Sequence, residues 1–207
     1  MKRSTTLWRG PSVFTGGPLA LQATCTDRPS DNRGTGDKVQ LAIWSPEHHP
    51  ALKEHRAHNC GGCALIWGGC YVNGGRLEDA WRRIADDVMP LEAFARLRRV
   101  RHRALRLGMD GDPAAVPAAW WAEFFAKVRP RRGWTAFVHG WKARPMRGGG
   151  VAPACDPSLA RWFMASADSP EERAEARALG YRTARVLAVP EGERPALEAG
   201  EVECFKM

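Results

Sequence analysis

The chain has 207 residues, which is the size of one domain and enough to bury a substantial core. Its 31 basic and 23 acidic side chains give a formal charge of +8. Residues 168–207 hold 6 basic and 9 acidic groups, so the positive excess lies in the first 167 residues. No stretch approaches the ~20 consecutive apolar residues of a membrane helix, and no apolar signal segment follows residues 1–8. We expect a soluble, cytoplasmic protein without a membrane partner, and its oligomeric state stays open.

Few regular elements are predicted before residue 60. Residues 1–37 are rich in Gly, Pro, Ser, Thr and Asn, and only residues 17–24 have the pattern of a strand. We therefore expect an irregular N-terminal segment. Residues 39–44 (Val-Gln-Leu-Ala-Ile-Trp) predict a strand that Ser45-Pro46 ends. A short connection then leads to a run of cysteines.

Three thiols, those of Cys60, Cys63 and Cys70, lie within eleven residues and are separated mostly by small or apolar residues. Thiolates this close, with glycines that let the backbone fold around a small object, are typical of a zinc site or an iron–sulfur cluster. A disulfide is the alternative, which a reducing compartment disfavours. The isolated Cys25 and Cys155 are predicted to be small, buried side chains.

The identity of the metal and of its fourth ligand is open at this point. Zinc would complete its shell with His55, His58 or Cys204. His58 lies only two residues before Cys60, a strained arrangement for one metal, so we interpret it as lying outside the ligand set. A [4Fe–4S] cluster on three thiolates would leave one iron open for a substrate. The spacing favours neither metal.

Helices and strands alternate after the cysteines, because runs with helical periodicity alternate with short runs of strand-forming residues. Helices are predicted at residues 77–88, 91–97, 117–128 and 170–180, and strands at residues 103–107, 134–138, 162–167 and 182–189. Ser169-Pro170 begins the last helix, and Gly180 ends it. The order predicts a single α/β domain over residues 1–207, with a mostly parallel sheet and helices packed on it. A mobile loop at residues 142–153 and a short tail at residues 190–207 complete it.

Polar side chains follow three of the predicted strands, and parallel sheets bind ligands at the carboxyl ends of their strands. We predict catalytic roles, in binding substrate or moving a proton, for Asp112, His139 and Asp168. Substrate-binding residues are predicted to be Asp110, Tyr71, Asn73, Trp141 and Ser166. The alternatives are a turn or cap role for Asp112, a competing cap role for Asp168, and a hydrogen-bonded strand-end position for His139.

The densest positive charge is the arginine run at residues 96–106. Such a patch attracts nucleic acid or a phosphorylated small molecule. The alternative is a solvated helix end, and a second alternative to the strand at 103–107 is that the same run extends the helix before it. Both interpretations stay open.

Five segments carry a resemblance that covers nearly the whole chain: Leu7–Ser12, Asn32–Gln40, Cys60–Asn73, Gly111–Pro117 and Met164–Ser169. Together they resemble an uncharacterised family encoded by tailed bacteriophages and prophages, with a Cys-x2-Cys-x6-Cys-Tyr-Val-Asn motif. The resemblance implies a location in the host cytoplasm and names no activity. Family members close with a second cysteine-rich segment, and of that segment Cys204 alone stands here.

More distantly, the cysteine run ending in Cys70-Tyr71 is similar to radical S-adenosylmethionine enzymes. Those enzymes space their thiolates three and then two residues apart, whereas the gaps here are two and six, and no Gly-Gly-Glu segment follows. The resemblance therefore implies a partial (βα) barrel with a cluster more strongly than it implies S-adenosylmethionine or radical chemistry.

Two functional classes follow. The first is a metal- or iron–sulfur-containing enzyme of phage nucleic-acid or nucleotide metabolism. The second is a metal-stabilised module that binds nucleic acid or another partner through the arginine run and exposed tryptophans. A small-molecule pocket that contains His139 and Asp168 would favour the enzyme, and a basic, aromatic surface without a pocket would favour the binding module.

Overall fold

The computed structural model describes residues 4–29, 36–67, 70, 72, 74–146 and 149–185. The strands are β1 (Ser4–Pro11), β2 (Pro18–Thr24), β3 (Val39–Trp44), β4 (Leu105–Leu107), β5 (Trp134–Val138), β6 (Arg144–Pro145), β7 (Val151–Ala152), β8 (Met164–Ala167) and β9 (Arg182–Arg185). The α-helices are α1 (Lys53–Cys60), α2 (Glu78–Trp81), α3 (Leu91–Arg96), α4 (Arg98–His102), α5 (Ala118–Lys127) and α6 (Pro170–Ala178). Short 3₁₀ turns lie at Ala64–Trp67, Gly74–Leu77, Pro113–Ala115 and Pro157–Arg161.

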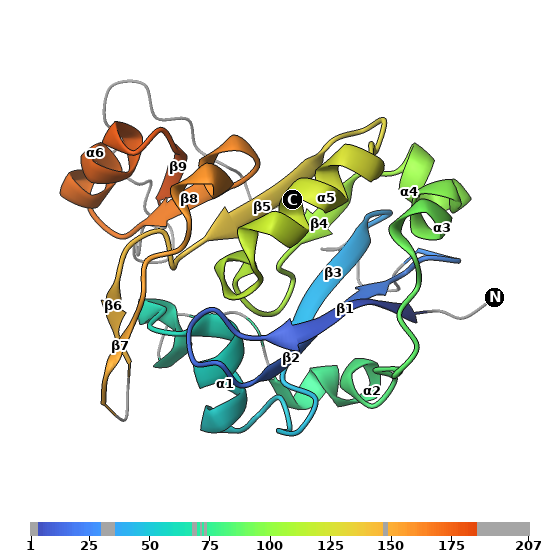
Figure 1. Cartoon of the computed structure of the whole chain (residues 1–207), viewed down its shortest axis with the longest axis horizontal. Coiled ribbons are helices and arrows are strands. Elements are labelled where there is room, and N and C mark those ends of the chain that lie inside the picture. Colours follow the sequence, from blue (N-terminus) through green and yellow to red (C-terminus); the bar gives the residue numbers. More distant parts are fainter. Residues whose placement is uncertain are drawn as a thin grey trace, which may run out of the picture.

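Seven of these strands form one open sheet in the order β1-β2-β3-β4-β5-β8-β9 (Figure 1). The first three are antiparallel, and β3, β4, β5, β8 and β9 are all parallel. The prediction of an α/β fold with a mostly parallel sheet is therefore confirmed. The sheet does not close on itself, so the structure shows no barrel. We call the side where the parallel strands end the carboxyl edge, and the side where they begin the amino edge.

The N-terminal segment predicted to be irregular holds two strands, of which β2 (Pro18–Thr24) is the strand predicted at residues 17–24 and β1 was not predicted. β1 pairs antiparallel with β2, from Ser4 opposite Thr24 to Pro11 opposite Pro18. The strand-forming residues Thr5 to Trp8 carry β1, and the turn formers that follow them close the hairpin rather than disrupt it. The composition of residues 1–37 therefore did not indicate β1, which pairs with β2 and extends the sheet.

Two predicted elements are shorter in the structure, because part of the backbone of each makes other hydrogen bonds. The strand predicted at 103–107 shortens to β4, because residues 98–102 of the arginine run form α4. The helix predicted at 77–88 stops at Trp81, because the following chain bonds to the sheet edge instead. There Met89 N donates to the Thr6 carbonyl at 2.9 Å, and Thr6 Oγ1 donates to the Ala85 carbonyl at 2.9 Å.

The later elements lie close to their predicted positions. The strands predicted at 134–138 and 162–167 are β5 and β8, and β9 covers the described part of the strand predicted at 182–189. Ser169 Oγ accepts the Glu172 N–H at 3.2 Å and caps α6, and Gly180 (φ 86°) follows its end as predicted. The predicted loop at 142–153 contains the hairpin β6–β7.

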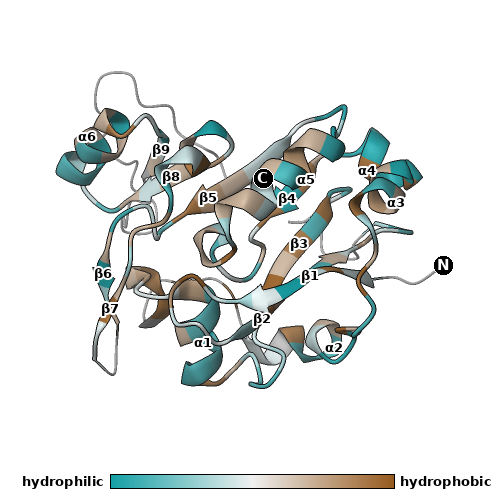
Figure 2. Ribbon diagram, viewed as in Figure 1, coloured by the Kyte–Doolittle hydropathy of each residue, from teal (hydrophilic) through white to brown (hydrophobic). Residues whose placement is uncertain are grey.

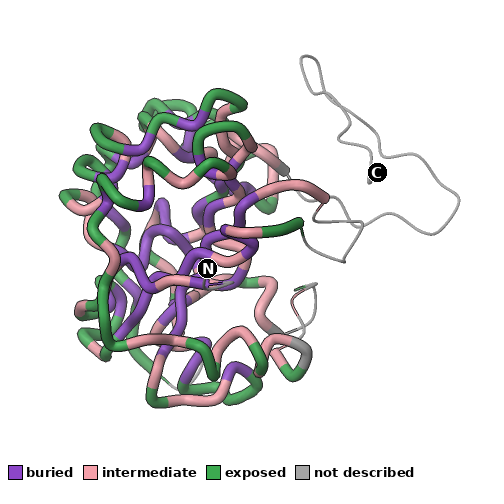
Figure 3. Tube along the Cα trace, turned by 90° about the vertical axis from the view of Figure 1, so that its right-hand side faces the viewer, coloured by how far each residue is buried: buried purple, intermediate pink, exposed green. Residues whose placement is uncertain are grey.

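The core lies between the sheet and the helices that cover one of its faces (Figures 2 and 3). β3 is buried along its whole length, and the rings of Trp121 and Phe124 on α5 pack into the same cluster. On the opposite face of β5, Thr135 and Phe137 are exposed. Among the described residues, no helix combines the length and apolarity needed to cross a membrane.

Candidate functional site

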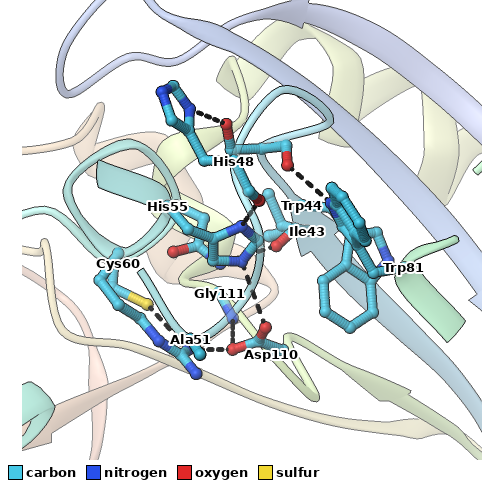
Figure 4. Close-up of polar contacts among 12 residues, drawn as sticks. Ile43, Trp44, His48, Ala51, His55, Cys60, Trp81, Asp110 and Gly111 are labelled. Atoms are coloured by element: carbon cyan, nitrogen blue, oxygen red, sulfur yellow. Dashed lines mark hydrogen bonds and ion pairs between the residues drawn. The ribbon is translucent and has the colours of Figure 1, made fainter. Parts of the chain in front are cut away.

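A buried polar cluster occupies the carboxyl edge beyond β3 and β4 (Figure 4). Asp110 is 1% exposed and forms an ion pair with Arg56, and its Oδ2 lies 3.5 Å from His55 Nε2. Asn59 Nδ2 donates to the Ile43 carbonyl at 2.8 Å and lies 3.0 Å from His55 Nε2. Burial alone would lower the pKa of Arg56, but the charge and hydrogen bond of Asp110, together with smaller contributions from Cys60, outweigh it and the pKa is raised. These contacts attach α1 to the ends of two strands.

Asp112, predicted to be catalytic, accepts three backbone hydrogen bonds. Ala114 N lies 2.9 Å from Oδ1, and His139 N and Gly140 N lie 2.7 and 2.8 Å from Oδ2. The carboxylate thus caps the turn at 113–115 and joins it to the end of β5. Burial raises the pKa of Asp112, although nearby His139 and the three N–H groups oppose that rise. Its cap role agrees with the alternative interpretation of the sequence.

The other predicted substrate and catalytic residues lie near the same edge in different settings. Trp141 and Ser166 are buried, and the Trp141 indole N–H donates to the Ser166 carbonyl at 2.8 Å. Asp168 pairs with Arg144 at 3.4 Å, and Arg144 also binds Glu172 at 3.0 Å. His139 is half-buried and lies near Asp112. Tyr71, Asn73 and Cys204 lie outside the described residues.

The cysteine run lies against this edge. Cys60 is the last residue of α1, and Arg56 Nη1 is 4.0 Å from its sulfur. Burial is the main reason that the pKa of the Cys60 thiol is raised and that of Cys63 reaches about 12. The charges of Asp112 and Asp168 also raise the pKa of Cys63, so this thiol lies close to two predicted catalytic residues. Cys70 is exposed.

Among the described residues, no three His, Cys, Asp or Glu side chains gather in an arrangement that would hold a metal ion. The zinc site and the iron–sulfur cluster on Cys60, Cys63 and Cys70 therefore stay predictions, and so does S-adenosylmethionine. Cys25 and Cys155 are buried as predicted, and Cys155 Sγ lies 3.4 Å from the Tyr181 hydroxyl.

A basic cleft of about 590 Å³ lies at the amino edge. We call it the arginine cleft; its lining is Asp27, Arg98, Arg99, His102, Arg103, Arg131 and Arg132. The arginine run supplies four of these side chains through α4 and its end, and the loop before β5 supplies two more. Arg131 N donates to the Arg101 carbonyl at 3.2 Å, which joins the two segments. Among the described residues, no Trp, Tyr or Phe side chain lines the cleft.

The charges in the arginine cleft are only partly neutralised. Asp37 pairs with Arg99 at 2.7 Å and with Arg103 at 2.6 Å. No carboxylate among the described residues pairs with the exposed Arg98, Arg131 or Arg132. Desolvation and then the charges of Arg131 and other arginines lower the pKa of His102.

Four of the seven lining residues belong to the arginine run that the sequence indicates at 96–106, whereas Arg131 and Arg132, which precede the strand at 134–138, were not predicted. The signal was available, because neighbouring parallel strands begin at the same edge and bring their preceding loops together. The burial of Arg56 had no such signal, since a charged residue on a polar helix is usually exposed.

Comparisons of the chain with protein-family models, with curated proteins and with solved structures found no match.

Proposed function

We propose that the protein binds nucleic acid through phosphate contacts in the arginine cleft. The observation that carries the proposal is the gathering of Arg98, Arg131 and Arg132 from two chain segments, without a described carboxylate partner, around one cleft. Guanidinium groups bind phosphate oxygens bidentately, and a cluster of them releases counterions from a polyanion.

The lining of the cleft favours a backbone contact over recognition of a small phosphorylated molecule. A pocket for a small ligand combines an apolar lining with a few placed polar groups. The arginine cleft has five arginines, one histidine and one aspartate instead. Its described lining contains no Trp, Tyr or Phe side chain, so guanidinium contacts to phosphates dominate, and these are independent of base sequence.

The test is fluorescence anisotropy with labelled duplex DNA and duplex RNA over a range of salt concentrations. The double variant R131A/R132A should weaken binding at low salt and flatten the plot of log affinity against log salt by about 1.8, since each DNA phosphate contact contributes about 0.9. The matched control is R83A/R177A, which removes two exposed arginines that do not line the cleft.

Equal slopes for the two double variants would overturn the proposal. ATP serves as a competitor at matched phosphate concentration. Displacement of the duplex by ATP would assign the cleft to a phosphorylated small molecule instead, and its failure to compete supports a polymeric ligand.

A further inference from the structure

Two thiols of the cysteine run occupy the ends of a tight turn. Gly61 has φ 56° and ψ −126°, and Cys63 N donates to the Cys60 carbonyl at 3.2 Å. These values are those of the first central residue of a type II′ turn, a position that favours glycine. A turn of this kind holds its first and fourth Cα atoms within about 7 Å, which overlaps the span of about 4.4–6.8 Å that a disulfide bridges.

The surrounding fold holds this turn in place. A Cβ atom on Gly61 would lie 2.9 Å from the Phe14 ring, and one on Gly62 would lie 2.6 Å from Arg144 Cβ and 2.8 Å from the Arg144 carbonyl oxygen. Neither position has room for a side chain without a shift of its neighbours. The β1–β2 turn and the start of β6 therefore pack tightly against the two glycines. This packing fixes the relative position of Cys60 and Cys63.

The third thiol gives solvent access to the pair. Two backbone hydrogen bonds turn the chain back after Cys63, because Ile66 N donates to the Cys63 carbonyl at 3.3 Å and Cys70 N donates to the Leu65 carbonyl at 2.7 Å. Cys70 is exposed, whereas Cys60 and Cys63 are only partly exposed. An oxidant from solvent therefore meets Cys70 first.

We propose that Cys60 and Cys63 form a reversible disulfide and that Cys70 relays the exchange. The oxidant is a low-molecular-weight disulfide of the glutathione class. The Cys70 thiolate attacks it, forms a mixed disulfide and releases one glutathione thiolate. Cys63 then attacks the Cys70 sulfur and releases the second glutathione, and Cys60 attacks Cys63 and frees Cys70. Two protein thiols are oxidised, one glutathione disulfide is reduced, and the two thiol protons pass to the two glutathione thiolates.

The test equilibrates the folded chain with mixtures of reduced and oxidised glutathione, followed by acid quenching, N-ethylmaleimide labelling and mass spectrometry of the tryptic peptide 57–76. At equilibrium, wild type and C70S should both lose two hydrogen atoms from this peptide. C70S should reach that state at about a tenth of the wild-type rate. C60S should leave no Cys60–Cys63 bridge. C60A, with circular dichroism of every variant, shows whether loss of the bridge reflects loss of the fold.

Three results would overturn the proposal. The first is a wild-type peptide that accepts three labels in every mixture. The second is a C70S peptide that keeps both thiols where wild type is oxidised, which would place the bridge at Cys70. The third is iron or zinc retained after anaerobic purification that protects Cys60 and Cys63 from oxidation, which would restore the metal prediction. Cys25 and Cys155, buried and isolated, are the internal controls and should stay reduced.

Discussion

The Asp112 carboxylate illustrates how a residue at a strand end serves the fold. It satisfies three backbone N–H groups from two loops, those of Ala114, His139 and Gly140. An unsatisfied buried donor costs about 1–3 kcal/mol. We expect D112A to lower the free energy of unfolding by at least about 3 kcal/mol in urea titrations. H139A, whose side chain makes none of these bonds, is the comparison and should cost less. Equal losses would show that the carboxylate is not the anchor.

The charge of Asp112 also gives a pH dependence. Burial raises its pKa above the ordinary value of 3.8, so the folded state holds this proton more tightly than the unfolded state does. The resulting contribution to stability is complete below pH 3.8 and is lost as pH rises through the folded pKa. D112N has no such proton. We expect the stability difference between wild type and D112N to shift in favour of D112N over that interval, measured by urea titration at several pH values.

At the scale of elements, α1 is fastened to the sheet by a buried ion pair. Arg56 and Asp110 are 11% and 0% exposed at their side chains, so removal of one partner leaves a buried charge alone. We expect R56M to lose about 3–5 kcal/mol in urea unfolding. The double variant R56M/D110N removes both charges and should recover part of that loss. A double variant no more stable than R56M would mean that the ion pair is not what makes the single substitution costly.

The N-terminus of α6 is held to the β6–β7 hairpin by a second set of charges. Glu172 binds Lys142 and Arg144 at 3.0 Å each, and it accepts the Asp168 N–H at 2.9 Å. Burial would raise the pKa of Glu172, but these donors prevail and lower it below 4.5. The contribution of Glu172 to the stability of the fold is therefore present above pH 4.5, and it is lost as the pH falls through the pKa of Glu172 in the folded state.

We expect E172Q to lower the free energy of unfolding by about 1 kcal/mol at pH 7 and by progressively less as the pH falls below 4.5. Thermal unfolding at several pH values measures this difference. E171Q is the matched control on the exposed side of the same helix turn. A cost for E172Q that is the same at pH 7 and at pH 3 would contradict the ion-pair argument.

The same elements show what sequence patterns could and could not predict. The apolar runs at 39–44 and 134–138 specify strands locally, and the Ser169 cap specifies the start of α6. The strand at residues 4–11 depends on pairing with β2, and the end of α2 depends on the edge of β1, so neither has a purely local signal. Asp112 and His139 were expected to lie together because parallel strands end at one edge, but the hydrogen bonds that occupy Asp112 are visible only in three dimensions.

At the scale of the whole molecule, the +8 charge is distributed unevenly, and the arginine cleft concentrates part of it at the amino edge. Like charges held together destabilise the compact state, and this repulsion weakens as salt screens it. A site that binds polyanions is therefore expected to cost stability when it is empty.

We expect R98Q/R131Q to raise the melting temperature by about 1–3 °C at low salt, because it removes two exposed charges from the cleft while leaving the Asp37 pairs intact. The gain should vanish near ~1 M salt, where the Debye length falls to about 3 Å. The same variant should bind duplex nucleic acid more weakly. R83Q/R177Q lowers the net charge equally outside the cleft, so an equal gain from that control would show that the total charge, and not its concentration in the cleft, sets the stability.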